Sequence, residues 1–322
     1  MEEMLNEPEV SMVIPLYNET HSFPHLIKRL NGLIDSLSIN IEVVLVDDGS
    51  KDDTASLIHE LATTNERYTG IFLSRNYGHQ TALSAGLMEA RGTQAIMIID
   101  GDLQDPPELL PTFYEYFKKG FDVVYAVRKR RKEGLFKRMC YYLFYRLLNS
   151  ISEINIPIDS GDFSLISRRI VDVLNKMPEE SRYIRGMRTW VGFKQIGVEY
   201  DRDERIAGSS KYSFKMLFKL AYNGIFNFSE FPIKFITRLG FFSFSVAMVF
   251  TLITLVKKFF FGSVPQGYTS LLIAIVLFSG VQLMSLGVIG EYIVRIFFQV
   301  KGRPLYNIRN KIIRRQTQDG KP

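Results

Sequence analysis

The stretch that decides the fold is residues 95–107, AIMIIDGDLQDPP, in which an apolar run ends abruptly in carboxylates, a glycine and two prolines. Its first five residues have no polar alternation, which predicts a parallel strand covered on both faces. Asp100, Asp102 and Gln104 then offer oxygen ligands of the kind that Mg²⁺ or Mn²⁺ prefers, and Gly101 would let the backbone approach a ligand closely. A solvated turn before a helix has the same composition, so the rest of the chain must decide between a metal site and a turn.

Short apolar runs alternate with helical patterns over the first 127 residues. This order predicts an α/β fold, in which a mostly parallel sheet is covered by helices. In such sheets, ligands bind beyond the carboxyl ends of the strands. The expected strands are 10–14, 43–46, 71–73, 95–99 and 123–127, and the expected helices lie near 22–38, 52–64, 79–90 and 107–118.

Polar residues follow each of the first four expected strands, at 15–19, 47–50, 74–78 and 100–105. No strand is followed by a Gly-x-Gly-x-x-Gly turn or a Gly-Lys-Ser/Thr loop, which argues against dinucleotide enzymes and P-loop ATPases. Asp47 or Glu19 could instead hydrogen-bond a base or ribose. Asp52, Asp53 or Thr54 could simply cap the helix that starts there, and we favour capping for both aspartates.

The second half of the chain predicts a membrane anchor. Residues 239–256 and 268–290 contain no charge and are long enough to cross a bilayer, and residues 212–236 have the pattern of interfacial amphipathic helices. The acidic N-terminus lacks the apolar core of a signal peptide. Positive charge before the first span and after the second favours a cytosolic location for both termini. The expected organisation is a cytosolic domain over 1–211, interfacial helices over 212–236, two transmembrane helices over 237–294 and a basic cytosolic tail over 295–322.

Composition excludes several classes of partner. The single cysteine, Cys140, excludes an internal disulfide framework and fits a reducing compartment, and the four histidines lack zinc-ligand spacing. Seven cations within residues 128–138 could bind nucleic acid, but no nucleic-acid module accompanies them, so no nucleic-acid partner is expected. Small residues in the second span, among them Gly287, suit helix packing and leave a homo-oligomer open.

Three motifs together resemble inverting family-2 glycosyltransferases of the GT-A fold: IPLYNE at 14–19, VDDGSKDDT at 46–54 and DGDLQDPPE at 100–108. DSGDF at 159–163, RGM at 185–187, WVGF at 190–193 and RIAGSSKY at 205–212 resemble the polyprenyl-phosphate branch, the relatives of dolichol-phosphate mannose synthase. With two membrane helices, bacterial bactoprenol glucosyltransferases are the nearest resemblance, over about residues 10–300. The Gln-x-x-Arg-Trp of processive synthases is absent, which disfavours a polymer-forming enzyme.

The resemblance implies roles for particular residues. The metal ligands would be Asp100, Asp102 and Gln104. The nucleotide would be bound by Pro15, Tyr17, Asn18, Glu19, Asp47, Asp48, Gly78 and Asp100. The acceptor phosphate would meet Arg128, Arg131, Arg205, Ser210 and Lys211, and the catalytic set would be Asp102, Asp159, Asp162, Arg128 and Arg205.

The implied reaction is the transfer of a hexose, with glucose the leading candidate, from a UDP-sugar to polyprenyl (undecaprenyl) phosphate at the inner (plasma) membrane, with inversion and Mg²⁺ or Mn²⁺ as cofactor. A non-catalytic nucleotide-binding scaffold and transfer to another lipid are the alternatives. A phosphate acceptor is largely dianionic at neutral pH, so Asp159 or Asp162 could act as a base or merely orient the acceptor. His79 could lie near the nucleotide, although we favour a role at the helix start.

Overall fold

The computed structural model describes residues 7–129, 160–180, 182–201, 231–261 and 267–319, which fall into two compact units. The sheet unit contains the described residues up to 201 together with 304–319. The helical unit contains the described residues from 231 to 303.

Nine strands of the sheet unit form one sheet in the order β7-β5-β6-β4-β1-β2-β3-β8-β9, counted over the described residues. The central strands β4, β1, β2 and β3 run parallel, as the apolar runs predict, while β6 is antiparallel to both β4 and β5. The sheet is therefore mixed, with its parallel part in the middle. The strands are β1 (Val10–Leu16), β2 (Ile41–Asp47), β3 (Tyr68–Leu73), β4 (Ala95–Ile98), β5 (Val123–Arg128), β6 (Ser160–Ser167), β7 (Gln195–Tyr200), β8 (Ile308–Ile313) and β9 (Gln316–Asp319).

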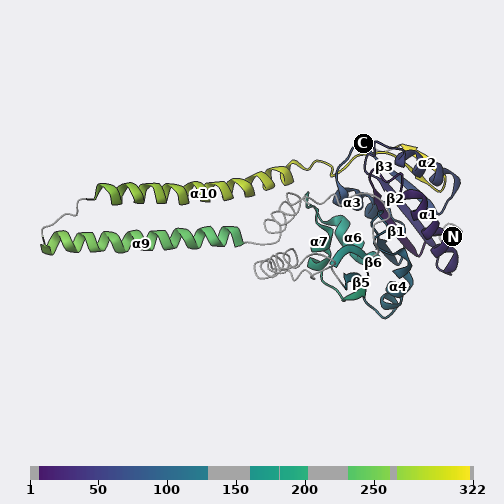
Figure 1. Ribbon diagram of the computed structural model, residues 1–322, viewed down its shortest axis with the longest axis horizontal. Coiled ribbons are helices and arrows are strands. Elements are labelled where there is room, and N and C mark those ends of the chain that lie inside the picture. The colour runs from purple at the N-terminus through teal and green to yellow at the C-terminus, as the bar shows by residue number, and fades with distance from the viewer. Residues whose placement is uncertain (1–6, 130–159, 181, 202–230, 262–266, 320–322) are drawn as a thin grey trace. The chain divides into compact units, whose positions relative to one another are not determined.

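Helices cover both faces of this sheet (Figure 1). On one face, α1 (Phe23–Ser36), α2 (Thr54–Thr64) and α4 (Leu110–Lys118) bury their apolar side chains in the main core. On the other, α3 (His79–Glu89) packs on β1 and β2 and contacts α6 (Arg168–Lys176). A short helix, α7 (Ile184–Trp190), follows α6. All seven residues of β1 are buried because both of its faces are covered, which explains why its sequence shows no polar alternation.

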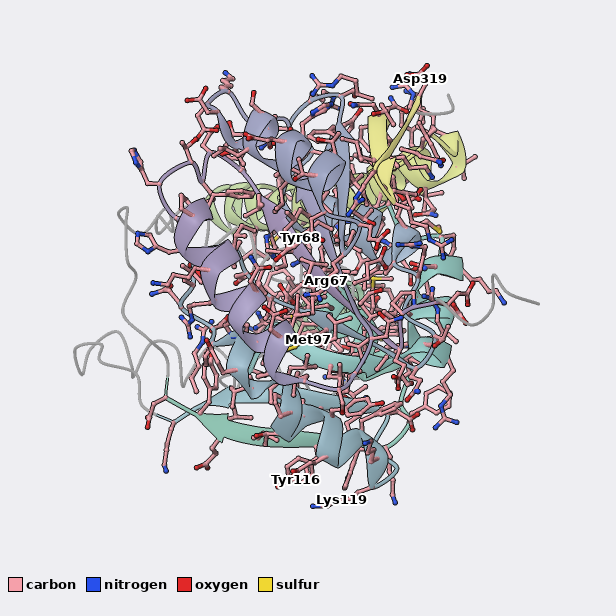
Figure 2. All side chains as sticks on the ribbon, turned by 90° about the vertical axis from the view of Figure 1, so that its right-hand side faces the viewer. Arg67, Tyr68, Met97, Tyr116, Lys119 and Asp319 are labelled. Carbon is pink, nitrogen blue, oxygen red and sulfur yellow. The ribbon has the colours of Figure 1, made fainter. Side chains whose placement is uncertain are left out.

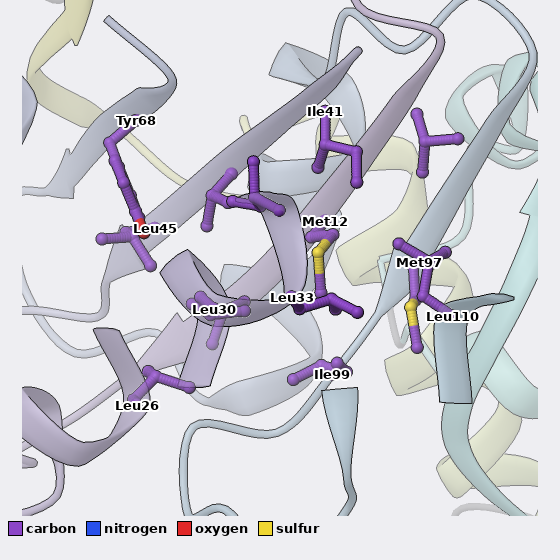
Figure 3. Packing of buried hydrophobic residues seen from close by; sticks show 14 of the residues in the cluster. Met12, Leu26, Leu30, Leu33, Ile41, Leu45, Tyr68, Met97, Ile99 and Leu110 are labelled. Carbon is purple, nitrogen blue, oxygen red and sulfur yellow. The ribbon is translucent and has the colours of Figure 1, made fainter. Parts of the chain in front are cut away.

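The core between β1 and α1 shows how side-chain alternation sorts residues between the two faces (Figure 3). Met12 and Ile14 belong to the core cluster beneath α1, together with Leu30 and Leu33 of that helix. Val13 points the other way, toward Gly86 of α3, where an added Cβ would lie 2.3 Å from its Cγ1. This packing fixes β1, so the loop that follows it starts from a rigid position.

The observed elements match the expected ones closely up to residue 128. The main difference is at 107–118, where a 3-10 turn over Pro107–Leu109 precedes α4, since the prolines at 106, 107 and 111 restrict the backbone there. The predicted interfacial helices at 212–236 lie outside the described residues except for their last six positions.

The end of the chain differs from the basic tail expected over 295–322. Helix α10 continues to Lys301, and the chain then forms β8 and β9, with β8 antiparallel to β3 at the edge of the sheet. Ile312 is fully buried there, and Lys311 Nζ lies 2.7 Å from Glu89 Oε2. Figure 2 shows Asp319 of β9 and Lys119, at the end of α4, at opposite ends of the sheet unit. The last segment therefore completes the sheet because the edge of β3 has unpaired backbone groups to offer.

The helical unit consists of α9 (Phe231–Phe261) and α10 (Tyr268–Lys301), which pack against each other (Figure 1). Within them, Pro232–Thr254 and Leu277–Lys301 are long and apolar enough to cross a membrane, judged by length and composition. The second stretch starts later than the expected span at 268–290. It includes Glu291 and Arg295, which form an i,i+4 ion pair at 3.0 Å.

Candidate functional site

The loop after β3 is held against the loop after β2 at the carboxyl edge of the sheet. Asp48 accepts hydrogen bonds from the backbone N–H of Tyr77 at 2.7 Å and of Gly78 at 3.0 Å. Gly49 has a φ of +65°, and a Cβ there would lie 2.5 Å from the carbonyl carbon of Arg75. Only glycine fits this approach, so the two loops converge where the predicted nucleotide residues lie.

The loop after β1 joins the same edge through backbone-directed hydrogen bonds. Asn18, with a φ of 54°, accepts from Lys51 N–H at 2.8 Å, and its own N–H donates to Ser50 Oγ at 3.0 Å. Glu19 N–H donates to Thr54 Oγ1 at 2.9 Å. The predicted nucleotide residues of the first two loops, namely Pro15, Tyr17, Asn18, Glu19, Asp47 and Asp48, are thereby brought to one end of β1 and β2.

The capping interpretation of Asp52 and Asp53 is half confirmed. Asp52 accepts a hydrogen bond from the N–H of Thr54, the first residue of α2, at 3.1 Å. Asp53 occupies the N-cap position, but its side chain makes no capping hydrogen bond. The carboxylate of Asp52, one residue before the N-cap, therefore accepts the hydrogen bond from the first backbone N–H of α2.

The loop after β4 brings Asp100 and Asp102 to the same edge. Asp102 Oδ1 accepts from the N–H of Gln104 at 3.2 Å, which is the local turn contact expected of this composition. A Cβ on Gly101 would lie 2.3 Å from Leu16 Cδ2, so the packing between this loop and the end of β1 also favours a glycine.

His79 begins α3, as expected, and its imidazole lies between two carboxylates. Its Nε2 is 3.4 Å from Asp100 Oδ1 and 3.8 Å from Asp162 Oδ2. Burial alone lowers the pKa of His79, but the charges of Asp162 and Asp100 outweigh it and raise the pKa to about 9. The side chain therefore adds a positive charge to the edge of the sheet at neutral pH.

Asp162 is held by groups from two other elements, α3 and α7. Gln80 Nε2 donates to its Oδ2 at 2.7 Å, while Gln80 Oε1 accepts from Ile184 N–H at 2.8 Å at the start of α7. Burial alone would raise the pKa of Asp162. The hydrogen bond from His79 and the charges of Arg185 and Arg188 have the larger effect, so the net pKa lies below the usual value of an aspartate. Asp162 is therefore a permanently ionised carboxylate.

Arg188 is the largest fully buried side chain of the described residues. Its Nη1 donates to Ser164 Oγ at 2.7 Å, and Ser164 Oγ donates to the backbone oxygen of Asp162 at 2.8 Å. Burial lowers the pKa of Arg188 to about 10, so the group stays charged at neutral pH. The buried positive charge of Arg188 stabilises the ionised form of Asp162.

The two carboxylates of the β4 loop fit a divalent cation in their chemistry. Asp100 Oδ1 is buried without a hydrogen-bond partner. Burial raises the pKa of Asp100, and the neighbouring carboxylates Asp105 and Asp102 add to this rise against the opposing charge of His79. The negative charge of these neighbouring carboxylates would be neutralised by a bound cation. Over the described part of the chain, however, no three or more His, Cys, Asp or Glu side chains gather as a ready-made metal cage.

Arg128 lies at the end of β5, where the site continues toward β6 and β7. Its guanidinium lies close to Gly161, since a Cβ on that glycine would be 3.6 Å from Arg128 Nη2. Gly161 is the residue before Asp162, so Arg128 lies beside the start of β6. The remaining predicted site residues, Arg131, Asp159, Arg205, Ser210 and Lys211, lie outside the described residues.

Several functional candidates were missed by reading the sequence. Gln80 and Ser164 belong to no recognised motif, and Arg188 falls between the motifs at 185–187 and 190–193. Tyr200, whose hydroxyl bonds Asp105, ends an ordinary-looking strand. The signal that could have identified one of these residues is position at the end of a strand, and among the four only Tyr200 has it.

Comparison with known proteins gives consistent matches. A family model described as glycosyl transferase family 2 matches residues 11–174. The uncharacterized glycosyltransferase YkcC of Bacillus subtilis is 43% identical over 302 residues, covering 94% of this chain and 93% of that protein. The bactoprenol glucosyl transferase of Shigella phage SfV is 39% identical over 304 residues, covering 94% of this chain and 99% of that protein. Among solved structures, the mannosyltransferase PcManGT of Pyrobaculum calidifontis has a TM-score of 0.45 at 16% identity, covering 87% of each chain.

Proposed function

Because the chain belongs to glycosyltransferase family 2, we propose that it transfers glucose from UDP-glucose to a polyprenyl phosphate with inversion, releasing UDP. The observation that carries this proposal is the 39% identity to bactoprenol glucosyl transferases, which runs over 94% of the chain and so includes the sheet unit and both apolar helices. A resemblance limited to the nucleotide-binding part would not favour a lipid acceptor. This one extends to the part of the chain that would meet the membrane.

The acceptor requires little activation by the enzyme. A phosphate monoester has a second pKa of about 6 and is largely dianionic at neutral pH, so it can attack the anomeric carbon without a general base. Asp162 is suited to a different role, because its Oδ2 is already engaged by Gln80 and its charge is balanced by His79, Arg185 and Arg188. We assign it to orienting the site, where it would hold its cationic neighbours in place.

The leaving group sets the second chemical requirement. UDP gains negative charge as the bond to glucose breaks, and Asp100, Asp102 and Gln104 would hold a divalent cation beside it. Such a cation supplies charge neutralisation without proton transfer. The chain itself supplies His79, which lies against Asp100 and is positively charged at neutral pH.

The membrane placement follows from the two long helices and from the tail. If α9 and α10 both cross the bilayer, the chain returns to its starting side. The pairing of β8 with β3 supports the same return, because both strands belong to one sheet. Together with the distribution of Lys and Arg, this supports a cytosolic sheet unit and cytosolic termini at the plasma membrane.

The direct test is to incubate purified protein in detergent with radiolabelled UDP-glucose, undecaprenyl phosphate and Mg²⁺ or Mn²⁺, and to analyse the lipid fraction. We expect one glucose-labelled lipid that depends on undecaprenyl phosphate. Parallel reactions with diacylglycerol or ceramide, and with UDP-N-acetylglucosamine, identify the acceptor and the sugar. Labelled product with diacylglycerol but not with undecaprenyl phosphate would refute the proposed acceptor, and no labelled lipid under any condition would refute the function.

A further inference from the structure

The buried side chains of Asp105 and Tyr200 form a cluster with the half-buried Arg128 beside the proposed site, and neither Asp105 nor Tyr200 has a role in the steps described above. The three residues come from the loop after β4, the end of β5 and the end of β7. The Tyr200 hydroxyl donates a hydrogen bond to Asp105 Oδ1. Tyr200 is 6% exposed and Asp105 is 1% exposed, so this bond is shielded from water.

The register of the sheet places Arg128 next to Tyr200. β5 and β7 are parallel, and Arg128 and Tyr200 are Cα partners at the end of the pair. Their side chains therefore project to the same face of the sheet. The N–H of Lys129 also donates to the backbone oxygen of Tyr200 at 3.0 Å, which extends the pairing by one residue and holds the two strand ends together.

The electrostatics of the cluster agree with its geometry. Burial lowers the pKa of Arg128, but the carboxylate of Asp105 and the Tyr200 hydroxyl raise it by more. Burial and the Asp105 charge also raise the pKa of Tyr200, so the phenol keeps its proton and remains a donor. A guanidinium has five N–H donors, and the Arg128 Nε is buried without a hydrogen-bond partner. The cluster therefore fixes the guanidinium without using all of its donors.

We propose that Tyr200 is a positioning residue that, together with Asp105, orients the Arg128 guanidinium toward the phosphate of the polyprenyl acceptor. This inference rests on the proposed function for the identity of the phosphate. The phenol is bonded to Asp105 and contacts Arg128 directly, and the charge of Asp105 attracts the guanidinium, so the arginine is held in place before the acceptor arrives. A pre-oriented guanidinium loses less conformational entropy on binding a phosphate and binds it more tightly.

The substitution that isolates this role is Tyr200→Phe, which removes only the hydroxyl. The ring would keep its edge-to-face contact with Phe163, where the centroids are 5.7 Å apart. The matched control is Tyr114→Phe, which removes a hydroxyl that is bonded to Gln94 at 2.9 Å, beside the amino end of β4 and thus at the opposite edge of the sheet. Both variants lose one tyrosine hydroxyl from a buried residue, so a general effect on folding should be similar in the two.

We expect Tyr200→Phe to raise the KM for undecaprenyl phosphate about tenfold or more, as is typical of losing a hydrogen bond to a charged group, with little change in the KM for UDP-glucose. The Kd of the full-length protein for farnesyl phosphate, measured without donor sugar, should rise by a similar factor. Tyr114→Phe should leave both constants unchanged. In an Arg128→Ala background, Tyr200→Phe should have no further effect, because it acts through Arg128.

Two results would overturn this inference. One is farnesyl phosphate binding by Tyr200→Phe that equals the wild type, and the other is an additive effect in the Arg128→Ala background. Failure of the proposed function is a separate result, because it would appear as the absence of glucosyl lipid from the wild-type enzyme. The farnesyl phosphate measurement decides the role of Tyr200 in either case.

Discussion

The segment after the two long apolar helices should contribute to the stability of the sheet unit, and Ile312→Ala tests this directly. Ile312 is fully buried, pairs with Gly70 of β3 and belongs to the main core. Truncating a buried isoleucine to alanine costs about 2–5 kcal/mol, since apolar contacts are lost and a cavity remains. For a domain of this size, a loss of about 3 kcal/mol corresponds to a fall in Tm of about 6–12 °C.

The assay can use the single tryptophan of the chain, Trp190, which lies in the sheet unit at the end of α7. Thermal unfolding of the full-length protein in detergent, followed by its fluorescence, therefore reports on the sheet unit. The matched control is Gln318→Ala, since Gln318 lies in the same hairpin but is exposed in β9. We expect the control to change Tm by less than about 2 °C. An equal Tm for Ile312→Ala and Gln318→Ala would refute the inclusion of β8 in the core.

Three further predictions concern the reaction and the membrane. Asp102→Asn should lower kcat for lipid-linked product by at least about 10²-fold at saturating Mg²⁺ or Mn²⁺, because an amide is a weaker ligand for a hard cation, and near-normal turnover would rule out the metal assignment. Arg205→Ala should raise the KM for undecaprenyl phosphate much more than that for UDP-glucose, and equal effects on both would indicate an ordinary surface loop. Epitope tags at the two termini should both be protected from protease in intact cells, whereas digestion of a C-terminal tag from outside would contradict the cytosolic tail.

The sequence determined the first five strands and the positions of the polar loops that follow the first four of them, because those features depend on local patterns. An apolar run of five residues followed by carboxylates identifies a buried strand and its end wherever the strand lies in the fold. The loops at Asn18, Asp48 and Asp100 were predicted in this way, and they meet at one edge because β1, β2 and β4 are parallel. The two long apolar helices were similarly predictable, since length and the absence of charge are properties of the segment itself.

Only the tertiary structure decided which residues support those loops. Tyr200 and Asp105 are 95 positions apart, and Gln80 and Asp162 are 82 apart, so no local pattern joins them. Gly101 also packs against Leu16, a contact that only the packing of β1 against the β4 loop could show. The last strands are a further case, because 308–313 is a short, half-polar segment that pairs with whichever edge is free. Here β3 provides that edge, more than 230 residues earlier in the chain, and long-range pairing of this kind depends on the completed sheet.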